Sequence, residues 1–214
     1  MSKENKLEQT KETRIAHEIS LAHTRDESGD DSEHPKIVGY AAVYDSLSQD
    51  LGGFKEKITR GAFAESLRQN DEVHALFNHS DDKILGRRGS GTLKLWEDDH
   101  GLRVEITPPN TTLGNDVVEL LRRGDLVSMS FGFYNTKDSW ENRDGEDIRT
   151  IESAKLFDVS VVTNPAYQST SVGVRSAISS LEKFKTENEL EETDFNSVGK
   201  NIDLRLKLRI AENG

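Results

Sequence analysis

The chain of 214 residues contains no cysteine, which excludes disulfide bonds, thiolate metal sites and a cysteine nucleophile. It also lacks any apolar run near the roughly 20 residues that a membrane helix needs. Residues 1–12 lack the apolar stretch of a signal peptide. Asp and Glu (39) outnumber Lys and Arg (28), and the resulting net charge of −11 repels nucleic acid and anionic lipid. We therefore expect an intracellular, soluble protein that binds neither nucleic acid nor membrane.

Several catalytic signatures are missing as well. The six histidines form no His-Glu-x-x-His pattern or comparable ligand spacing, so no metal is expected. There is no Walker loop and no G-x-G-x-x-G after a strand, so no nucleotide cofactor is expected either. The G-x-S-x-G elbow of α/β-hydrolases is also absent. Any catalysis must use another arrangement of side chains, without a cofactor.

Composition divides the chain into three parts. Hydrophobic residues make up only 33% and charged residues 31%, which favours a globular middle with polar ends. We expect a flexible segment at residues 1–12, one domain at 13–175 and an acidic tail at 176–214. Six acidic residues fall within residues 182–194 of this tail. The strict alternation of residues 202–210 predicts a strand that seeks a partner.

Alternation of polar and apolar residues predicts many short strands in the domain. They are expected at 15–21, 36–44, 54–58, 71–79, 92–96, 102–107, 126–134 and, as one or two strands, within 148–163. The turn at residues 98–101 predicts a hairpin between two of them. Residues 137–146 are expected to form a polar loop. These strands, with few helices, predict an α+β fold with a mainly antiparallel or β-barrel core.

Two segments have helical spacing. Residues 62–68 predict a short helix, and residues 112–123 predict the longest one. Thr112 or Asn115 is the expected cap at the start of the longer helix, and Gly124 is expected to end it.

Ser130 is the candidate nucleophile, within the apolar segment at residues 126–134. A strand would hold its hydroxyl rigidly, as covalent catalysis requires, and Gly132 would let a substrate backbone approach closely. The alternative is a small residue packed in a sheet, with its hydroxyl bonded to backbone. Ser128 would lie on the same strand face, so the residues alone leave both serines open.

His79 is the candidate general base. It ends a predicted strand and begins the polar loop His-Ser-Asp-Asp-Lys, so it would be held firmly and still reach substrate. The alternative is a surface histidine at a turn. His74, on the opposite face of the predicted strand, is a second candidate.

Asp158 is the candidate that would orient the base. It lies inside an apolar strand, where an unpaired charge is costly. Pairing with an imidazole would satisfy the carboxylate and hold the histidine tautomer. The alternative is a charge on an edge strand that discourages aggregation, and Glu152 is a second acid that could take the orienting role. These residues alone indicate a hydrolase and no more.

Several segments together resemble the prohead protease family of HK97-type tailed phages, over residues 37–174. In chain order they are VGYAAVYDS, FKEKITRGAF, LFNHS, ILGR, GTLKLWEDDHGLRVEI, GDLVSMSFGF and LFDVSVVTNPAY. The resemblance implies that His79 is the catalytic histidine, that Ser130 rather than Ser128 is the nucleophile, and that Asp158 is the third member. The family usually has Glu where this chain has Asp158, so that assignment departs from the pattern by one methylene.

The resemblance implies a serine endopeptidase that acts through an acyl-enzyme. Its implied partners are the major capsid protein with its scaffolding region, and its own tail, inside the assembling procapsid in the host cytoplasm. It also implies a β-barrel core wrapped by a few helices, as in herpesvirus assembly proteases, and a dimer by analogy. The oxyanion donors are expected in the loop at Gly86 and Arg87 or in the turn after Pro165.

Two other functions remain open. A non-catalytic module for capsid assembly or scaffold binding would keep the fold and leave the triad idle. A hydrolase of small esters or amides would need a deep apolar pocket, and an aromatic content of 7% offers little to line one.

Overall fold

The computed structural model describes five stretches of the chain: residues 11–16, 18–22, 35–70, 72–163 and 177–187. Contacts divide the chain into two units, Met1–Arg175 and Ser176–Gly214. The second unit contributes a helix at residues 177–187, which overlaps the acidic tail segment. The strand expected at residues 202–210 lies outside the described residues.

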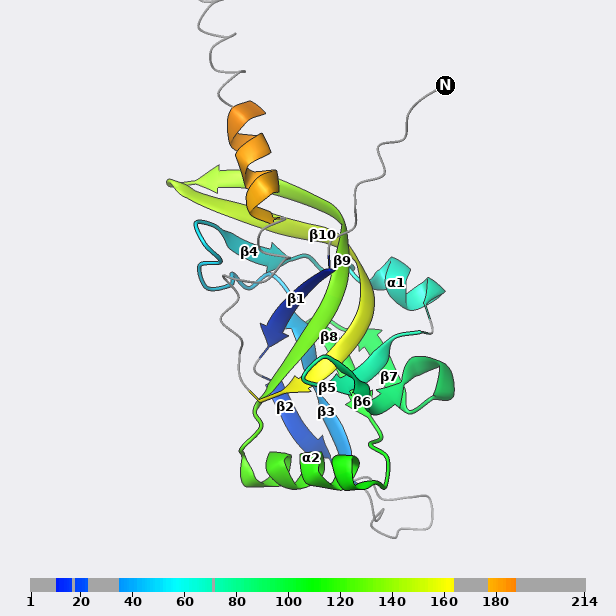
Figure 1. Ribbon diagram of the computed structural model, residues 1–214. Helices are drawn as coiled ribbons and strands as arrows, with labels where there is room; N and C mark the ends of the chain where they lie inside the picture. The colour runs from blue at the N-terminus through cyan, green and yellow to red at the C-terminus, as the bar shows by residue number, and fades with distance from the viewer. Residues whose placement is uncertain (1–10, 17, 23–34, 71, 164–176, 188–214) are drawn as a thin grey trace, which may run out of the picture. The chain divides into compact units, whose positions relative to one another are not determined.

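The larger of two sheets in the first unit has six strands. Its members are β1 (Lys11–Ala16), β4 (Lys55–Ile58), β5 (His74–Phe77), β6 (Ser80–Arg87), β9 (Ser128–Arg143) and β10 (Glu146–Val162). The order is β1-β9-β10-β5-β6, with β4 also pairing with β10 (Figure 1). β9 and β10 form one long, curved hairpin to which β1, β4 and β5 attach, and β6 pairs with β5. β4 and β5 pair with β10 in parallel, so the fold is α+β and mostly, but not entirely, antiparallel.

The smaller sheet has four strands, in the order β2-β3-β8-β7. They are β2 (Glu18–Ala22), β3 (Lys36–Val43), β7 (Leu93–Glu97) and β8 (Gly101–Ile106). β7 and β8 form the predicted hairpin. A short 3-10 helix, Arg88–Ser90, joins β6 to β7.

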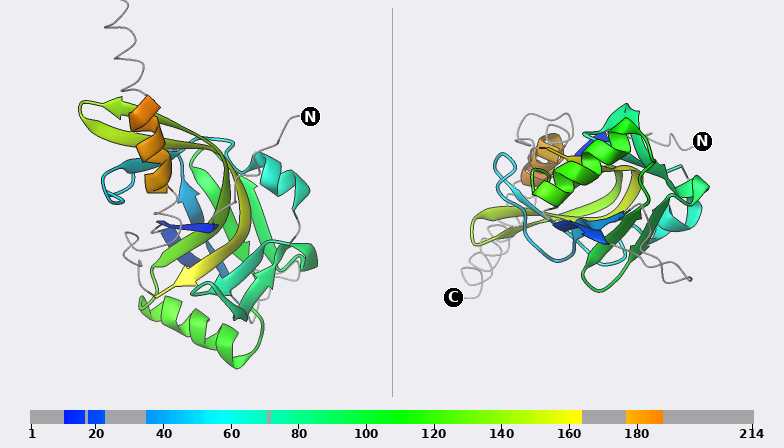
Figure 2. Two further views of the ribbon diagram at one scale, coloured as in Figure 1. Left: turned by 45° about the horizontal axis from the view of Figure 1, so that its top comes forward. Right: turned by 90° about the horizontal axis from the view of Figure 1, so that it is seen from below.

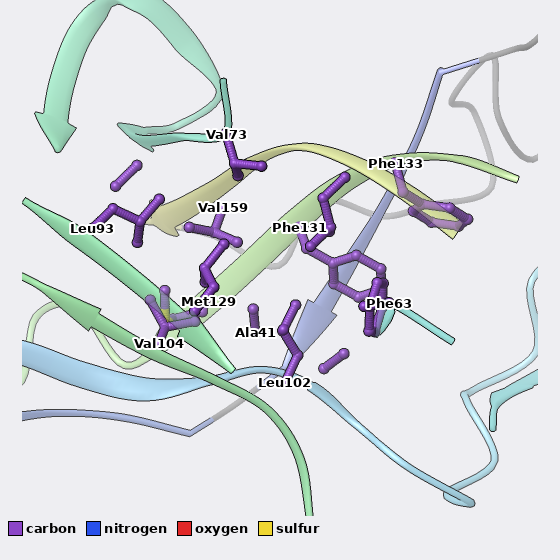
Figure 3. Packing of buried hydrophobic residues seen from close by; sticks show 14 of the residues in the cluster. Ala41, Phe63, Val73, Leu93, Leu102, Val104, Met129, Phe131, Phe133 and Val159 are labelled. Carbon is purple, nitrogen blue, oxygen red and sulfur yellow. The ribbon is translucent and has the colours of Figure 1, made fainter. Parts of the chain in front are cut away.

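The hydrophobic core lies between the two sheets. In Figure 3, Met129 and Phe131 of β9 lie in one buried cluster with Leu102 and Val104 of β8. Phe131 also meets Phe63 edge to face, at 5.5 Å between ring centroids. This packing leaves the opposite face of β9 and β10 for polar residues, because successive side chains of a strand point to opposite faces.

Two helices cover the sheets. α1 (Ala64–Gln69) begins two residues after the predicted start, and α2 (Thr112–Arg123) has the predicted bounds. Seen from below, α2 crosses in front of the strands (Figure 2). Its cap is Thr111, whose hydroxyl accepts the amide N–H of Gly114, rather than Thr112 or Asn115. Gly124 ends the helix in the left-handed conformation, with φ of 78°. No helix in the described part of the chain is long and apolar enough to cross a membrane.

Three of the expected strands and loops were wrong. The single strand expected at 15–21 is two strands in different sheets, and the first begins already at Lys11. The polar stretch after His79 is β6, paired with β5. The expected loop at 137–146 belongs to the β9–β10 hairpin, which turns at Asp144 and Gly145. Both polar stretches are strands because a neighbouring strand pairs with their backbone N–H and C=O groups while their side chains stay exposed.

Candidate active site

Ser130 lies on the face of β9 that points away from the core. Met129 and Phe131, on either side of it, are core residues, so alternation along the strand turns the Ser130 hydroxyl to the other face. Across the hairpin, Ser160 of β10 is the partner of Ser130, and Asp158 is the partner of Gly132. Two strands therefore place a serine and a carboxylate on one face.

The register of β10 shifts just before Asp158. Leu156 pairs with Phe133 and Asp158 pairs with Gly132, so Phe157 is an extra residue in β10. Such a bulge bends the strand and redirects the neighbouring side chains, and bulges recur beside active sites.

Gly132 provides the space that this bulge needs. A Cβ atom there would lie 2.4 Å from the Phe157 ring and 2.6 Å from Oδ2 of Asp158. Gly132, where a substrate backbone is expected to approach, also leaves room for Phe157 and the Asp158 carboxylate.

His79 sits at the tip of the β5–β6 hairpin rather than at a strand end. Phe77 pairs with Ser80, and the two residues between them, Asn78 and His79, have φ values of 55° and 53°. Positive φ at both central residues is the pattern of a type I′ turn. A left-handed residue other than glycine costs roughly 1–2 kcal/mol, so the surrounding structure has to hold this turn.

Contacts to the end of β10 hold the turn in place. The Asn78 amide donates to the carbonyl of Val161 at 2.9 Å, and the Asn78 side-chain oxygen accepts from the Thr163 amide at 3.0 Å. The His79 amide donates to the Ser160 hydroxyl at 3.2 Å. These bonds bring the imidazole over the face that carries Ser130 and Asp158.

The three predicted residues form one hydrogen-bonded chain. His79 Nδ1 lies 2.7 Å from Asp158 Oδ1, and His79 Nε2 lies 2.7 Å from Ser130 Oγ. An ionised carboxylate only accepts hydrogen bonds, so Nδ1 carries the proton and Nε2 is the acceptor facing the serine. This is the tautomer in which an imidazole can remove a hydroxyl proton.

The Ser130 hydroxyl has a second acceptor, which the sequence did not indicate. Its Oγ also lies 2.8 Å from the carbonyl oxygen of Arg14 on β1, the strand that pairs with β9. One hydroxyl proton is thus shared between His79 and the Arg14 carbonyl. Ser130 is 2% exposed and the His79 side chain 27%, so solvent reaches the site mainly from the histidine side.

Ser160 is a further polar residue that the sequence analysis did not single out. It is fully buried, and its hydroxyl lies 3.0 Å from Asp158 Oδ1 and 3.3 Å from His79 Nδ1. The signal that could have identified it is its position two residues after Asp158, which puts both side chains on one strand face.

The alternative candidates lie elsewhere. Ser128 is opposite Val162, two residues further along the hairpin than the Ser130–Ser160 pair. His74 is a backbone partner of Asp158 in the sheet, but the imidazole bonded to that carboxylate belongs to His79.

Glu152 faces Lys137 instead of the histidine, at 2.6 Å. The hydrogen bond from that lysine lowers the pKa of Glu152. Of the two expected oxyanion positions, the Arg87 amide is already bonded to the Thr92 hydroxyl at 2.9 Å, and the turn after Pro165 lies outside the described residues.

A second buried polar cluster lies further along the same strands. Its members, the ion-pair cluster, are Glu12, Arg14, Glu56, Asp138 and Arg149, drawn from β1, β4, β9 and β10. Burial opposes the charge of Arg14, but Glu56 and Glu12 outweigh it and raise the pKa of that guanidinium. The cluster ties β1 to the sheet, and with it the Arg14 carbonyl that contacts Ser130.

A metal site is not in evidence in the described stretches, where no three His, Asp or Glu side chains are grouped to hold an ion. A serine, an imidazole and a carboxylate joined in that order are instead the arrangement of hydrolases that act through a serine. This geometry is typical of serine hydrolases as a class.

The chain belongs to the caudovirus prohead serine protease family, which it matches over residues 20–187. The family resemblance inferred from the motifs is confirmed. Among solved structures, the bacteriophage T4 capsid assembly protease gp21 is similar, with 10% sequence identity and a TM-score of 0.46. The similarity covers 72% of this chain and 99% of that one. No curated protein matches the sequence.

Proposed function

We propose that this chain is a serine endopeptidase in which Ser130 is the nucleophile, His79 the general base and Asp158 the residue that orients the base. The hydrogen-bonded chain from Asp158 through His79 to Ser130, with 2.7 Å at each step, carries the proposal. Membership of a protease family supports it independently.

The proposed reaction is acyl transfer. His79 Nε2 takes the proton of Ser130 as Oγ bonds to the peptide carbonyl carbon, and Asp158 stabilises the imidazolium that forms. The imidazolium then protonates the leaving nitrogen, and the C–N bond breaks to give an acyl-enzyme. Water, deprotonated by His79, attacks the ester and releases Ser130 with its proton restored.

The proposed substrates are phage capsid components: the scaffolding region and N-terminal part of the major capsid protein. The setting is the assembling procapsid in the host cytoplasm, and family membership supports it. The net charge of −11 supports a protein partner over nucleic acid or a membrane. We include the chain's own residues 176–214 as a substrate, because their composition is that of a solvated tail.

The proposal extends to architecture. We infer a protease domain at the expected residues 13–175, extended at its start to Lys11 because β1 begins there, with a segment before it and the tail at 176–214 after it. We also infer that its strand core is a barrel wrapped by helices, as in herpesvirus assembly proteases, and that the domain self-associates as a dimer.

One observation favours a second candidate, a non-catalytic assembly module of the same fold. Ser130 is almost fully buried and shares its proton with the Arg14 carbonyl, so the serine in this structure is covered. For catalysis, a peptide has to reach Oγ from the exposed side of His79.

Co-expression with the major capsid protein of the same phage tests both candidates, with both chains followed by intact mass. Ser130→Ala and His79→Ala are expected to reduce cleavage by about 10⁴-fold or more, and Ser128→Ala to leave it unchanged. A fluorophosphonate probe, which labels activated serines without a specific substrate, should label Ser130 and fail to label the His79→Ala variant. Processing that persists in Ser130→Ala, or an unlabelled wild type that processes nothing, would favour the assembly module.

A further inference from the structure

We propose that Ser160 is a positioning residue of the triad, one hydroxyl that holds both the backbone of His79 and the carboxylate of Asp158. The inference rests on the proposed protease function, and it adds a fourth side chain to the three that the motifs indicated. Ser160 touches no substrate; it acts through the two residues that it bonds.

The hydroxyl is fully used by these two residues. It donates its single proton to Asp158 Oδ1 at 3.0 Å and accepts the amide N–H of His79 at 3.2 Å. Its oxygen also lies 3.3 Å from His79 Nδ1, beside the proton that the imidazole shares with Asp158. A hydroxyl has one donor and two acceptor positions, and these three contacts occupy all of them.

The location explains why such a hydroxyl is needed. His79 has a φ of 53°, a backbone conformation that is uncommon for residues other than glycine and that surrounding contacts have to stabilise. Its side chain is partly exposed, so packing alone does not fix the ring. Ser160 bonds the backbone of this strained residue and the carboxylate that sets its ring, and therefore couples the turn to the strand.

The β10 strand places the hydroxyl where it can do this. Ser160 is fully buried and lies directly opposite Ser130 in the hairpin, two residues from Asp158 on the same face. A serine that only filled space would bond its hydroxyl to neighbouring backbone. The contacts of Ser160 run instead to two members of the triad on different elements.

Ser160→Ala is the direct test, with Ser66→Ala as the matched control. Ser66 is also buried, and its hydroxyl accepts the amide N–H of Leu156 without contact to the triad. Ser160→Ala is expected to lower kcat about 10–100-fold through misplacement of the base, with KM within about twofold of wild type. Ser66→Ala is expected to change neither constant, although it also removes a buried hydrogen bond.

Proton NMR on the capsid-free protein gives a second readout. The Nδ1 proton between His79 and Asp158 should give a downfield resonance that persists in Ser66→Ala and broadens in Ser160→Ala. A folded Ser160→Ala variant with wild-type kcat and an unchanged resonance would overturn the assignment.

Ser160→Cys tests the same role of the hydroxyl if the Ser160→Ala variant does not fold. A thiol nearly preserves the side-chain volume but is a weak hydrogen-bond donor and acceptor. A loss of kcat of at least about fivefold is expected, since the donor to Asp158 is weakened. Wild-type kcat in Ser160→Cys would overturn the role of Ser160 alone. Failure of wild type to cleave or to be labelled at Ser130 would instead overturn the protease function.

Discussion

Two buried polar clusters lie along β10, the ion-pair cluster around Arg149 and the triad around Asp158. In the ion-pair cluster, two guanidiniums meet three carboxylates, and Arg149 and Glu56 are each about 3% exposed or less. In the triad, one hydroxyl proton faces two acceptors, and the imidazole remains partly open to solvent. The two clusters therefore differ in two respects: the ion-pair cluster matches charges away from solvent, whereas the triad shares a proton and stays partly open to solvent.

The two clusters differ in whether their side chains can exchange protons near neutral pH. Guanidinium protons do not leave near neutral pH, so the ion-pair cluster can only hold strands together. An imidazole loses and gains a proton in that range, so the triad can pass one between atoms. Under the proposed function, the same sheet therefore has a structural end, the ion-pair cluster, and a chemical end, the triad, joined by β1, which carries Arg14.

Among the variants that compare the two clusters, the largest effect is expected from Asp158→Asn, which alters the triad alone. The amide can donate to Nδ1, which would put the imidazole in the wrong tautomer, while the side-chain volume is kept. We expect kcat to fall by about 10³–10⁴-fold in single-turnover cleavage of the capsid substrate. Glu152→Gln is the control and should remain within about twofold of wild type. The reverse ranking would assign the orienting role to Glu152.

Arg149→Met tests the structural end. It leaves the buried carboxylates of Glu12 and Glu56 short of a partner, and we expect the free energy of unfolding to fall by about 3–5 kcal/mol in urea titration. Arg143→Met, which removes an exposed pair with Glu141, should cost at most about 1 kcal/mol. Equal losses from the two variants would mean that burial does not distinguish these ion pairs.

Gly132→Ala is expected to affect both the stability of the fold and the activity of the triad. The added methyl would press on Phe157 and the Asp158 carboxylate, so we expect about 1–3 kcal/mol lower stability and about 10–100-fold lower kcat per folded molecule. Gly114→Ala is the control, because its methyl would press on the Pro109 carbonyl, away from the triad. It should lower stability with kcat unchanged. A fall in kcat with Gly114→Ala would show that any loss of stability reaches the site.

The smallest effect is expected from Tyr44→Phe, a buried polar contact with one hydrogen bond. Burial, together with the bond donated to Glu97, raises the pKa of Tyr44 well above its ordinary value of 10.0. The unfolded state ionises first as pH rises, so this contribution to stability is complete below pH 10.0 and is lost above it. We expect the variant to be about 1–2 kcal/mol less stable near neutral pH. Denaturation at several pH values should show the difference shrinking above pH 10, and a constant difference would contradict the titration.

The limits of sequence reasoning are visible in particular elements. The α2 helix was predicted with its bounds, because its apolar spacing and Gly124 are local signals. The β6 strand was missed, because its polar residues reveal a strand only when β5 lies beside it. The extension of β9 and β10 was missed for the same reason.

Within the candidate site, the sequence by itself determined which residue types were available and, through family motifs, which three to choose: His79, Ser130 and Asp158. Strand alternation was enough to turn Ser130 away from the apolar residues that flank it. These are properties of short stretches of chain, so they can be predicted without the tertiary structure.

Only the tertiary structure decided how these residues meet. The left-handed turn at His79, the bulge at Phe157 and the contacts of Ser160 and the Arg14 carbonyl each depend on a strand from a distant part of the chain. Hydrogen bonds act over about 3 Å, whereas the partners of Ser130 lie 51 and 116 residues away in sequence. Strand pairing across the sheet sets those distances, so a local sequence pattern cannot predict them.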